Sequence, residues 1–121
     1  MAKVLGLGGI FFKSKDPKAL MRWYSEHLGL PGEDYVAFEP SAMPPGGSTV
    51  FSAFKDDTDY FAPSSQPFMF NLVVDDLDGA LKQVQAGGAE LLGAREDYDY
   101  GSFGRFLDPD GNKVELWQPK S

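Results

Sequence analysis

The chain has 121 residues, of which 42% are hydrophobic, and a formal net charge of −7. This length and composition suit one globular domain with a real core and exclude a disordered chain. Its Lys and Arg residues form no basic cluster, so we expect no nucleic-acid partner. No run approaches the roughly 20 apolar residues of a membrane span, so we expect no membrane partner. No signal-peptide pattern opens the chain, and we expect a cytoplasmic protein.

The first half is predicted to hold three strands and one helix. Residues 4–15 have a strand pattern that glycines weaken. A helix should begin at Asp16-Pro17, because Asp is a favourable N-cap and Pro suits the first helical position, and should end at Gly29. Two further strands are expected over 33–39 and 49–55, on either side of a loop rich in Pro and Gly.

The second half repeats this order. A polar linker, 56–67, precedes a strand predicted over 68–75. A second helix should begin at the N-cap Asp76 and end at Gly87-Gly88. A short strand is expected from residue 90, and residues 96–100, EDYDY, are interpreted as an acidic and aromatic loop. The apolar face of this helix is formed by Leu77, Ala80, Leu81 and Val84.

The chain ends in a predicted hairpin around the turn DPDG, residues 108–111. Proline pre-sets the first turn position, and glycine supplies the positive φ of a three-residue loop. In that register Asp108 pairs with Asn112, and Arg105 pairs with Glu115. Alternation then places two sets of side chains on opposite faces. The apolar set is Phe106, Val114 and Leu116; the mixed set is Phe103, Arg105, Leu107, Lys113, Glu115 and Trp117. The mixed face fits either the wall of a ligand cup or an ordinary half-exposed sheet surface.

The two halves also align with one another, since IFFKSKDPKALMRWY matches FNLVVDDLDGALKQV with Asp16 on Asp76. With WYSEHLGLP and the closing GRFLDPDGNKVELWQP, these segments resemble the vicinal oxygen chelate superfamily, which includes glyoxalases, bleomycin-resistance proteins and extradiol dioxygenases. The resemblance implies one α+β domain over 1–121, in which two βαβββ modules, about 4–55 and 68–119, are joined by the linker. Their curled mixed sheet should form a cup with the helices outside, usually within a homodimer.

The resemblance also implies four metal-ligand positions, one on each of four strands. Transferred by spacing, they fall on Gly9, on a residue within 49–54, on Met69 and on Glu115. Only Glu115 can bind a metal ion, because the other positions carry no carboxylate, amide or imidazole. We therefore expect no cofactor. The alternative is a divalent ion (Zn, Ni, Mn or Fe) on Glu115, completed by residues such as Glu39 or Asp97.

We expect a small-molecule ligand, aromatic or cationic, on this face, and predict no catalytic residue. The candidate ligand-binding residues are Phe11, Phe51, Met69, Asn71, Phe103, Arg105, Glu115 and Trp117. Further aromatic candidates for the cup are Tyr60, Tyr98 and Tyr100, with the Glu96–Tyr100 segment at its mouth. Two simpler interpretations stay open: Glu115 forms only an ion pair with Arg105, and the aromatic residues belong to the core or a dimer interface. The alternative function is a metal-dependent lyase, isomerase or dioxygenase of the same superfamily.

Overall fold

The structure is a computed structural model that describes residues 1–3, 5, 7–32 and 35–120. Its elements are α1 (Pro17–Leu28), the short 3-10 helix η1 (Pro40–Ala42), β1 (Phe70–Val73), α2 (Leu77–Ala86), β2 (Glu90–Leu91), β3 (Glu96–Tyr98), β4 (Gly101–Leu107) and β5 (Lys113–Pro119). None of the helices in these ranges is long and apolar enough to cross a membrane.

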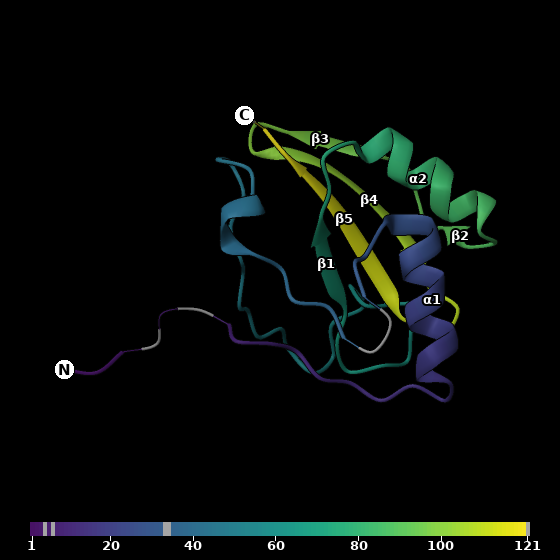
Figure 1. Ribbon diagram of the computed structural model, residues 1–121, viewed down its shortest axis with the longest axis horizontal. Helices are drawn as coiled ribbons and strands as arrows, with labels where there is room; N and C mark the ends of the chain where they lie inside the picture. The colour runs from purple at the N-terminus through teal and green to yellow at the C-terminus, as the bar shows by residue number, and fades with distance from the viewer. Residues whose placement is uncertain (4, 6, 33–34, 121) are drawn as a thin grey trace.

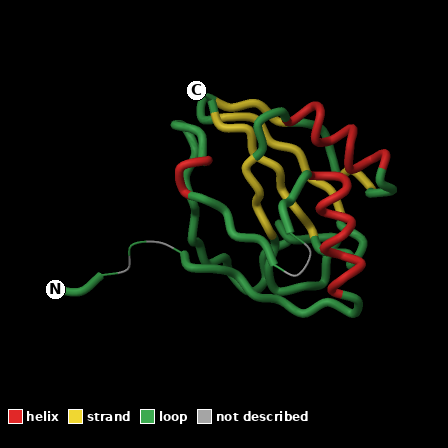
Figure 2. Tube along the Cα trace, in the orientation of Figure 1, coloured by secondary structure: helices red, strands yellow, loops and turns green. Residues whose placement is uncertain are grey.

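One mixed sheet of five strands forms the centre of the molecule (Figure 1). Strand β5 lies between β1, which runs parallel to it, and β4, which runs antiparallel. The short strands β2 and β3 pair with opposite ends of β4 along its other edge. Figure 2 shows the two helices side by side on one side of the strands, with a long loop region making up most of the first half.

Both helices begin and end where the sequence predicts. The Asp16 carboxylate accepts a hydrogen bond from the backbone N–H of Ala19 at 3.1 Å, and Gly29 ends α1 with a φ of 67°. The Asp76 carboxylate accepts from the N–H of Gly79 at the same distance. Each aspartate therefore satisfies one of the N–H groups that the first helical turn leaves unpaired.

The core lies between the helices and one face of the sheet. It contains Leu20 and Tyr24 of α1, the three inward residues Leu77, Ala80 and Val84 of α2, and Phe106, Val114 and Leu116 of the hairpin. This confirms the predicted apolar face of the hairpin, because those three strand residues are fully buried. The mixed face points away from the helices, and we call it the outer face.

The closing hairpin has the predicted register. The N–H of Asp108 donates to the carbonyl of Asn112 at 3.0 Å, and Arg105 lies opposite Glu115. Gly111 has a φ of 80°, the left-handed conformation that this turn requires.

The prediction of an acidic loop over 96–100 is wrong in part, because the first three residues of that segment form β3. Glu96 pairs with Phe103 and Tyr98 pairs with Gly101 in a tight hairpin. Gly101 has a φ of 143°, and a Cβ there would lie 2.4 Å from the indole nitrogen of Trp117. The pairing depends on a partner strand and on this close approach, neither of which residues 96–100 reveal by themselves.

The strand predictions for the first half are wrong over the described residues, which contain no strand before Phe70. Residues 4, 6, 33 and 34 of those predictions lie outside the described ranges. A strand persists only where a neighbour completes its hydrogen-bond ladder, and these segments have no such partner here. Their large apolar side chains are consequently exposed, including Leu5 (89%), Phe11 (97%) and Phe51 (89%).

Candidate functional site

Glu115 lies at the centre of the outer face, on the middle strand of the sheet. The residue is 8% exposed, so its charge requires nearby partners. Oε2 accepts hydrogen bonds from Arg105 Nε at 2.9 Å and from the Tyr60 hydroxyl at 2.6 Å, and Oε1 accepts from Asn71 Nδ2 at 2.8 Å. Both carboxylate oxygens are therefore satisfied by side chains from β4, β1 and the linker.

Two cations flank this carboxylate. Arg105 bonds Glu96 as well as Glu115, and Lys113 donates from its Nζ to the backbone carbonyl of Tyr60. Burial lowers the pKa of Lys113, and the charge of Arg105 lowers it further. The pKa of Glu96 is lowered by the hydrogen bond from Tyr98 and by Arg105, so Glu96 stays ionised and balances one of the cations.

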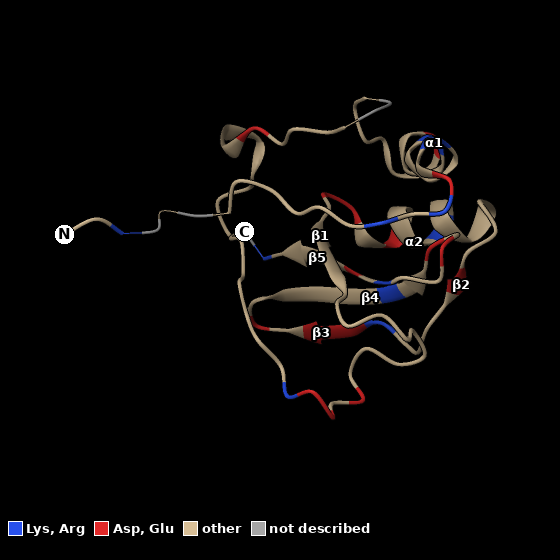
Figure 3. Ribbon diagram, turned by 90° about the horizontal axis from the view of Figure 1, so that it is seen from below, with Lys and Arg blue, Asp and Glu red and all other residues tan. Residues whose placement is uncertain are grey.

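Tyr60 brings the linker onto the outer face. The acidic linker, at the bottom of Figure 3, lies on the side of the sheet away from the helices. Burial raises the pKa of the Tyr60 phenol, and its hydrogen bond to Glu115 raises it further. The phenol therefore stays protonated near neutral pH and can donate its hydrogen to the carboxylate.

Aromatic side chains continue the outer face beyond the charged cluster. The rings of Phe103 and Trp117 are stacked with centroids 5.9 Å apart and an interplanar angle of 4°. Tyr98 and Tyr100 form a second stacked pair at 5.3 Å, and both approach Phe103 edge-on. Trp117 is buried, whereas Tyr98 is 43% and Tyr100 is 61% exposed. The two exposed tyrosines offer aromatic surface beside a set of hydrogen-bonding groups.

The structure brings most of the predicted candidates together. Asn71, Arg105 and Glu115 are joined by hydrogen bonds, and Phe103 and Trp117 follow along the same two strands. Half-buried Met69 precedes β1. Phe11 and Phe51 are not brought to this cluster, because both lie exposed in the irregular first half.

Three participants were not among the candidate ligand-binding residues. Strand alternation places Lys113 on the correct face but gives it no role, and Glu96 falls in the segment expected to be a loop. Tyr60 is predicted only as an aromatic candidate within a polar linker. Its contact with Glu115 joins residues 55 positions apart, and no local pattern in the linker indicates it.

The residues around Glu115 do not fit a metal ion. Its two oxygens already accept hydrogen bonds, and Arg105 and Lys113 place positive charge where a divalent cation would bind. Asp97 lies on the other face of the sheet, where it bonds Arg95 and Ser102. Within the ranges that the structure describes, no three His, Asp or Glu side chains gather as a metal site.

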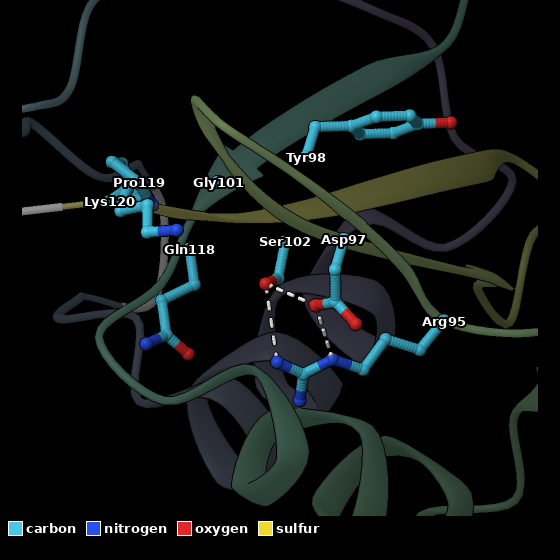
Figure 4. A pocket seen from close by; sticks show the side chains of 8 residues that line it. All are labelled: Arg95, Asp97, Tyr98, Gly101, Ser102, Gln118, Pro119 and Lys120. Carbon is cyan, nitrogen blue, oxygen red and sulfur yellow. Dashed lines mark hydrogen bonds and ion pairs between the residues drawn. The ribbon is translucent and has the colours of Figure 1, made fainter.

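A hollow of about 440 Å³ lies at the far end of the hairpin (Figure 4). Arg95 spans it, bonding Asp97 at 3.0 Å and Asp78 of α2 at 2.5 Å. Its lining residues are Arg95, Asp97, Tyr98, Gly101, Ser102, Gln118, Pro119 and Lys120. The hollow is polar and contains none of the eight candidate ligand-binding residues.

Two solved bacterial structures are similar to this chain. A glyoxylase/bleomycin resistance protein/dioxygenase domain from Frankia sp. EAN1pec has a TM-score of 0.61 and 16% identity, covering 98% of this chain and 100% of that chain. TnmS3, an antibiotic binding protein from Streptomyces sp. CB03234, has 26% identity over 88% of each chain and a TM-score of 0.49. The Frankia similarity confirms the predicted fold class.

The sequence itself identifies the family. The profile of the Glyoxalase-like domain matches residues 9–117, which is most of the chain. The chain therefore belongs to the glyoxalase-like domain family, and the resemblance inferred from its motifs is confirmed. A comparison with curated proteins finds no match.

Proposed function

We propose that this protein binds a small aromatic molecule on the outer face of its sheet, without a metal ion. The observation that carries the proposal is the state of Glu115, the one potential metal ligand among the transferred positions. It is buried and fully hydrogen-bonded, and it lies between two cations and beside stacked aromatic rings. An apolar surface with a few convergent polar groups is the usual composition of a small-molecule site.

The distribution of charge makes a neutral aromatic ligand the first choice. Arg105 and Lys113 oppose a cation at the Glu115 end of the face. A cationic aromatic molecule would instead bind near Tyr98 and Tyr100, where exposed ring faces lie close to the carboxylate of Glu96. The two ligand types therefore differ in the part of the face that they would contact.

The alternative function is a metal-dependent lyase, isomerase or dioxygenase. The observation in its favour is Glu115 itself, which occupies a ligand position of the superfamily in the closing hairpin. It would require Arg105, Asn71 and Tyr60 to release the carboxylate, together with ligands from outside the present cluster. Because three contacts would have to break, we place this function second.

We further propose that the chain acts as a homodimer. A single copy leaves large apolar side chains of the first half in solvent, among them Ile10 (62%), Phe11 (97%), Val50 (70%) and Phe51 (89%). Exposed apolar surface on this scale is typical of an interaction site. A second copy would cover it and supply partners for the unpaired segments.

The binding proposal is tested by a thermal-shift screen of neutral and cationic aromatic compounds, followed by calorimetric titration of the hits. We expect neutral aromatic compounds to raise the melting temperature. Affinity for a cationic compound should fall in Glu96→Gln, which removes the carboxylate beside Tyr98, while that for a neutral compound should change much less. A screen in which neither class binds would contradict the proposed function.

A further inference from the structure

Tyr60 occupies the polar centre of the outer face as a bound molecule would. Its hydroxyl donates to Glu115 Oε2 at 2.6 Å and accepts from Arg105 Nη2 at 3.2 Å. Glu115 and Arg105 are also joined directly at 2.9 Å, and Asn71 holds the other carboxylate oxygen. The three groups form a preassembled receptor for one oxygen atom that carries one hydrogen.

The ring of Tyr60 is held as well as its hydroxyl. Lys113 Nζ lies 4.8 Å from the ring centroid, and the guanidinium carbon of Arg105 lies 5.7 Å from it. Phe54 stacks on the ring at 5.7 Å with an interplanar angle of 10°. The outer face thus contacts a complete phenol, with cations over the ring and a charged acceptor at the hydroxyl.

The receptor and its occupant differ in how firmly they are held. Arg105 and Glu115 lie on paired central strands, whereas Tyr60 belongs to a linker of turns. Two local backbone hydrogen bonds, from Thr58 to Lys55 and from Ala62 to Asp59, shape the linker around Tyr60, and Lys113 Nζ joins its backbone carbonyl to the sheet. Exposed loops with few contacts open at low free-energy cost, whereas central strands do not.

We propose that Tyr60 is an internal stand-in for the ligand, and that the ligand is a hydroxylated aromatic compound whose phenol group displaces it. This inference rests on the proposed function and specifies its ligand. When the ligand binds, residues 56–67 leave the face, and the ligand hydroxyl takes over the bonds to Glu115 and Arg105. Tyr60 thereby excludes compounds that cannot replace both bonds.

The chemistry of the receptor selects a hydroxyl over other groups. A hydroxyl both donates and accepts, as the contacts to Glu115 and Arg105 require. An ammonium group donates but cannot accept from Arg105, and the two cations repel it. A carboxylate accepts but is repelled by Glu115. An ether accepts from Arg105 but leaves Glu115 Oε2 without the O–H donor that Tyr60 supplies.

The first test removes the stand-in and supplies its side chain separately. In Tyr60→Ala, 4-methylphenol should raise the melting temperature, while 4-methylanisole, which lacks the donor hydrogen, should not. The matched control is Tyr35→Ala, which removes a tyrosine that is 79% exposed. Its shift with 4-methylphenol should equal that of the natural protein and be smaller than that of Tyr60→Ala. Equal responses to both compounds, or no response in Tyr60→Ala, would overturn the inference.

A second variant keeps the ring and tests competition. Tyr60→Phe loses only the hydroxyl that occupies Glu115, so the linker should open more readily. A phenolic ligand should then bind about tenfold more tightly than to the natural protein, since a hydrogen bond to a charged group contributes about one decade in affinity. The gain should vanish in Tyr60→Phe combined with Glu115→Gln. Unchanged affinity in Tyr60→Phe would contradict the displacement of Tyr60.

The third test follows the linker directly in the otherwise natural chain, which contains no cysteine. An environment-sensitive dye on Asp57→Cys should change its emission when 4-methylphenol is added and not when 4-methylanisole is added. If aromatic compounds bind the outer face without preference for a hydroxyl and without this change, the inference fails while the proposed function stands. If none binds, the proposed function fails with it.

Discussion

Tyr24 illustrates how single residues fix this fold. Its hydroxyl donates to Asp108 Oδ2 at 2.8 Å and connects α1 to the hairpin turn. The same carboxylate also accepts from the backbone and side-chain N–H groups of Asn112. Tyr24→Phe removes one donor from a buried carboxylate, and we expect a loss of about 1–2 kcal/mol in the free energy of unfolding at pH 7, measured by urea denaturation.

The same tyrosine predicts a pH dependence. Burial raises the pKa of the Tyr24 phenol, and the Asp108 charge raises it further. The folded protein therefore retains this proton above the ordinary tyrosine pKa of about 10, where the unfolded chain loses it. The stabilising contribution is complete below that pH and declines as the pH rises beyond it. Denaturation curves between pH 9 and 11 should show a smaller decline for Tyr24→Phe; identical slopes would contradict this role.

Trp117 provides a residue-scale test of the ligand site. Trp117→Leu keeps apolar volume but removes the ring that stacks on Phe103. We expect affinity for an aromatic ligand to fall about threefold to tenfold, as the loss of an aromatic pair implies. Trp23→Leu, which removes the indole that contacts Phe106 on the other side of the sheet, is the calorimetric control. Equal losses in both variants would indicate a general loss of structure.

At the scale of elements, the hairpin from Gly101 to Pro119 organises both the core and the site. Its turn depends on Gly111, whose φ is 80°. Gly111→Ala should lower the free energy of unfolding by about 1 kcal/mol, because a side chain is disfavoured in the left-handed region. Gly8→Ala, with no atom within 4 Å of the added Cβ, should change stability much less. Thermal melts of the two variants make the comparison; equal stability losses would contradict this role for the turn.

Elements with local signals could be predicted from the sequence. The Asp16 and Asp76 caps defined both helices, and the DPDG turn fixed the register that pairs Arg105 with Glu115. Strand β3 was missed because it depends on a partner and on the glycine at 101. The expected strands of the first half fail in this structure for a related reason: period-two patterns show that a segment can pair, not that a partner is available.

The candidate site was predictable to the same extent. Alternation along the hairpin placed Arg105, Glu115 and Trp117 on one face, and the internal repeat added Asn71. Tyr60 was not predictable as a contact of Glu115, because it reaches the sheet from a linker whose composition indicates only a solvated loop. Long-range contacts made by loops depend on the whole fold and leave no local signal.

At the scale of the whole molecule, the exposed apolar residues of the first half predict self-association. Light scattering after size-exclusion chromatography should give twice the chain mass of 13.3 kDa. Phe11→Ser combined with Phe51→Ser should shift the protein toward the monomer. The control Tyr100→Ser, which changes an exposed aromatic residue of the second half, should not. A natural protein that stays monomeric at high concentration would contradict the homodimer.

For the molecule as a whole, the function proposed above makes the outer face a site for an organic ligand and not a metal centre. The most direct measurement is the metal content of untagged protein, purified without chelators and analysed by mass spectrometry. We expect far less than one Zn, Ni, Mn or Fe ion per chain, because Glu115 is paired with Arg105, Asn71 and Tyr60. One ion per chain, lost in Glu115→Gln, would contradict the proposed function and would make the metal-dependent enzyme the better description.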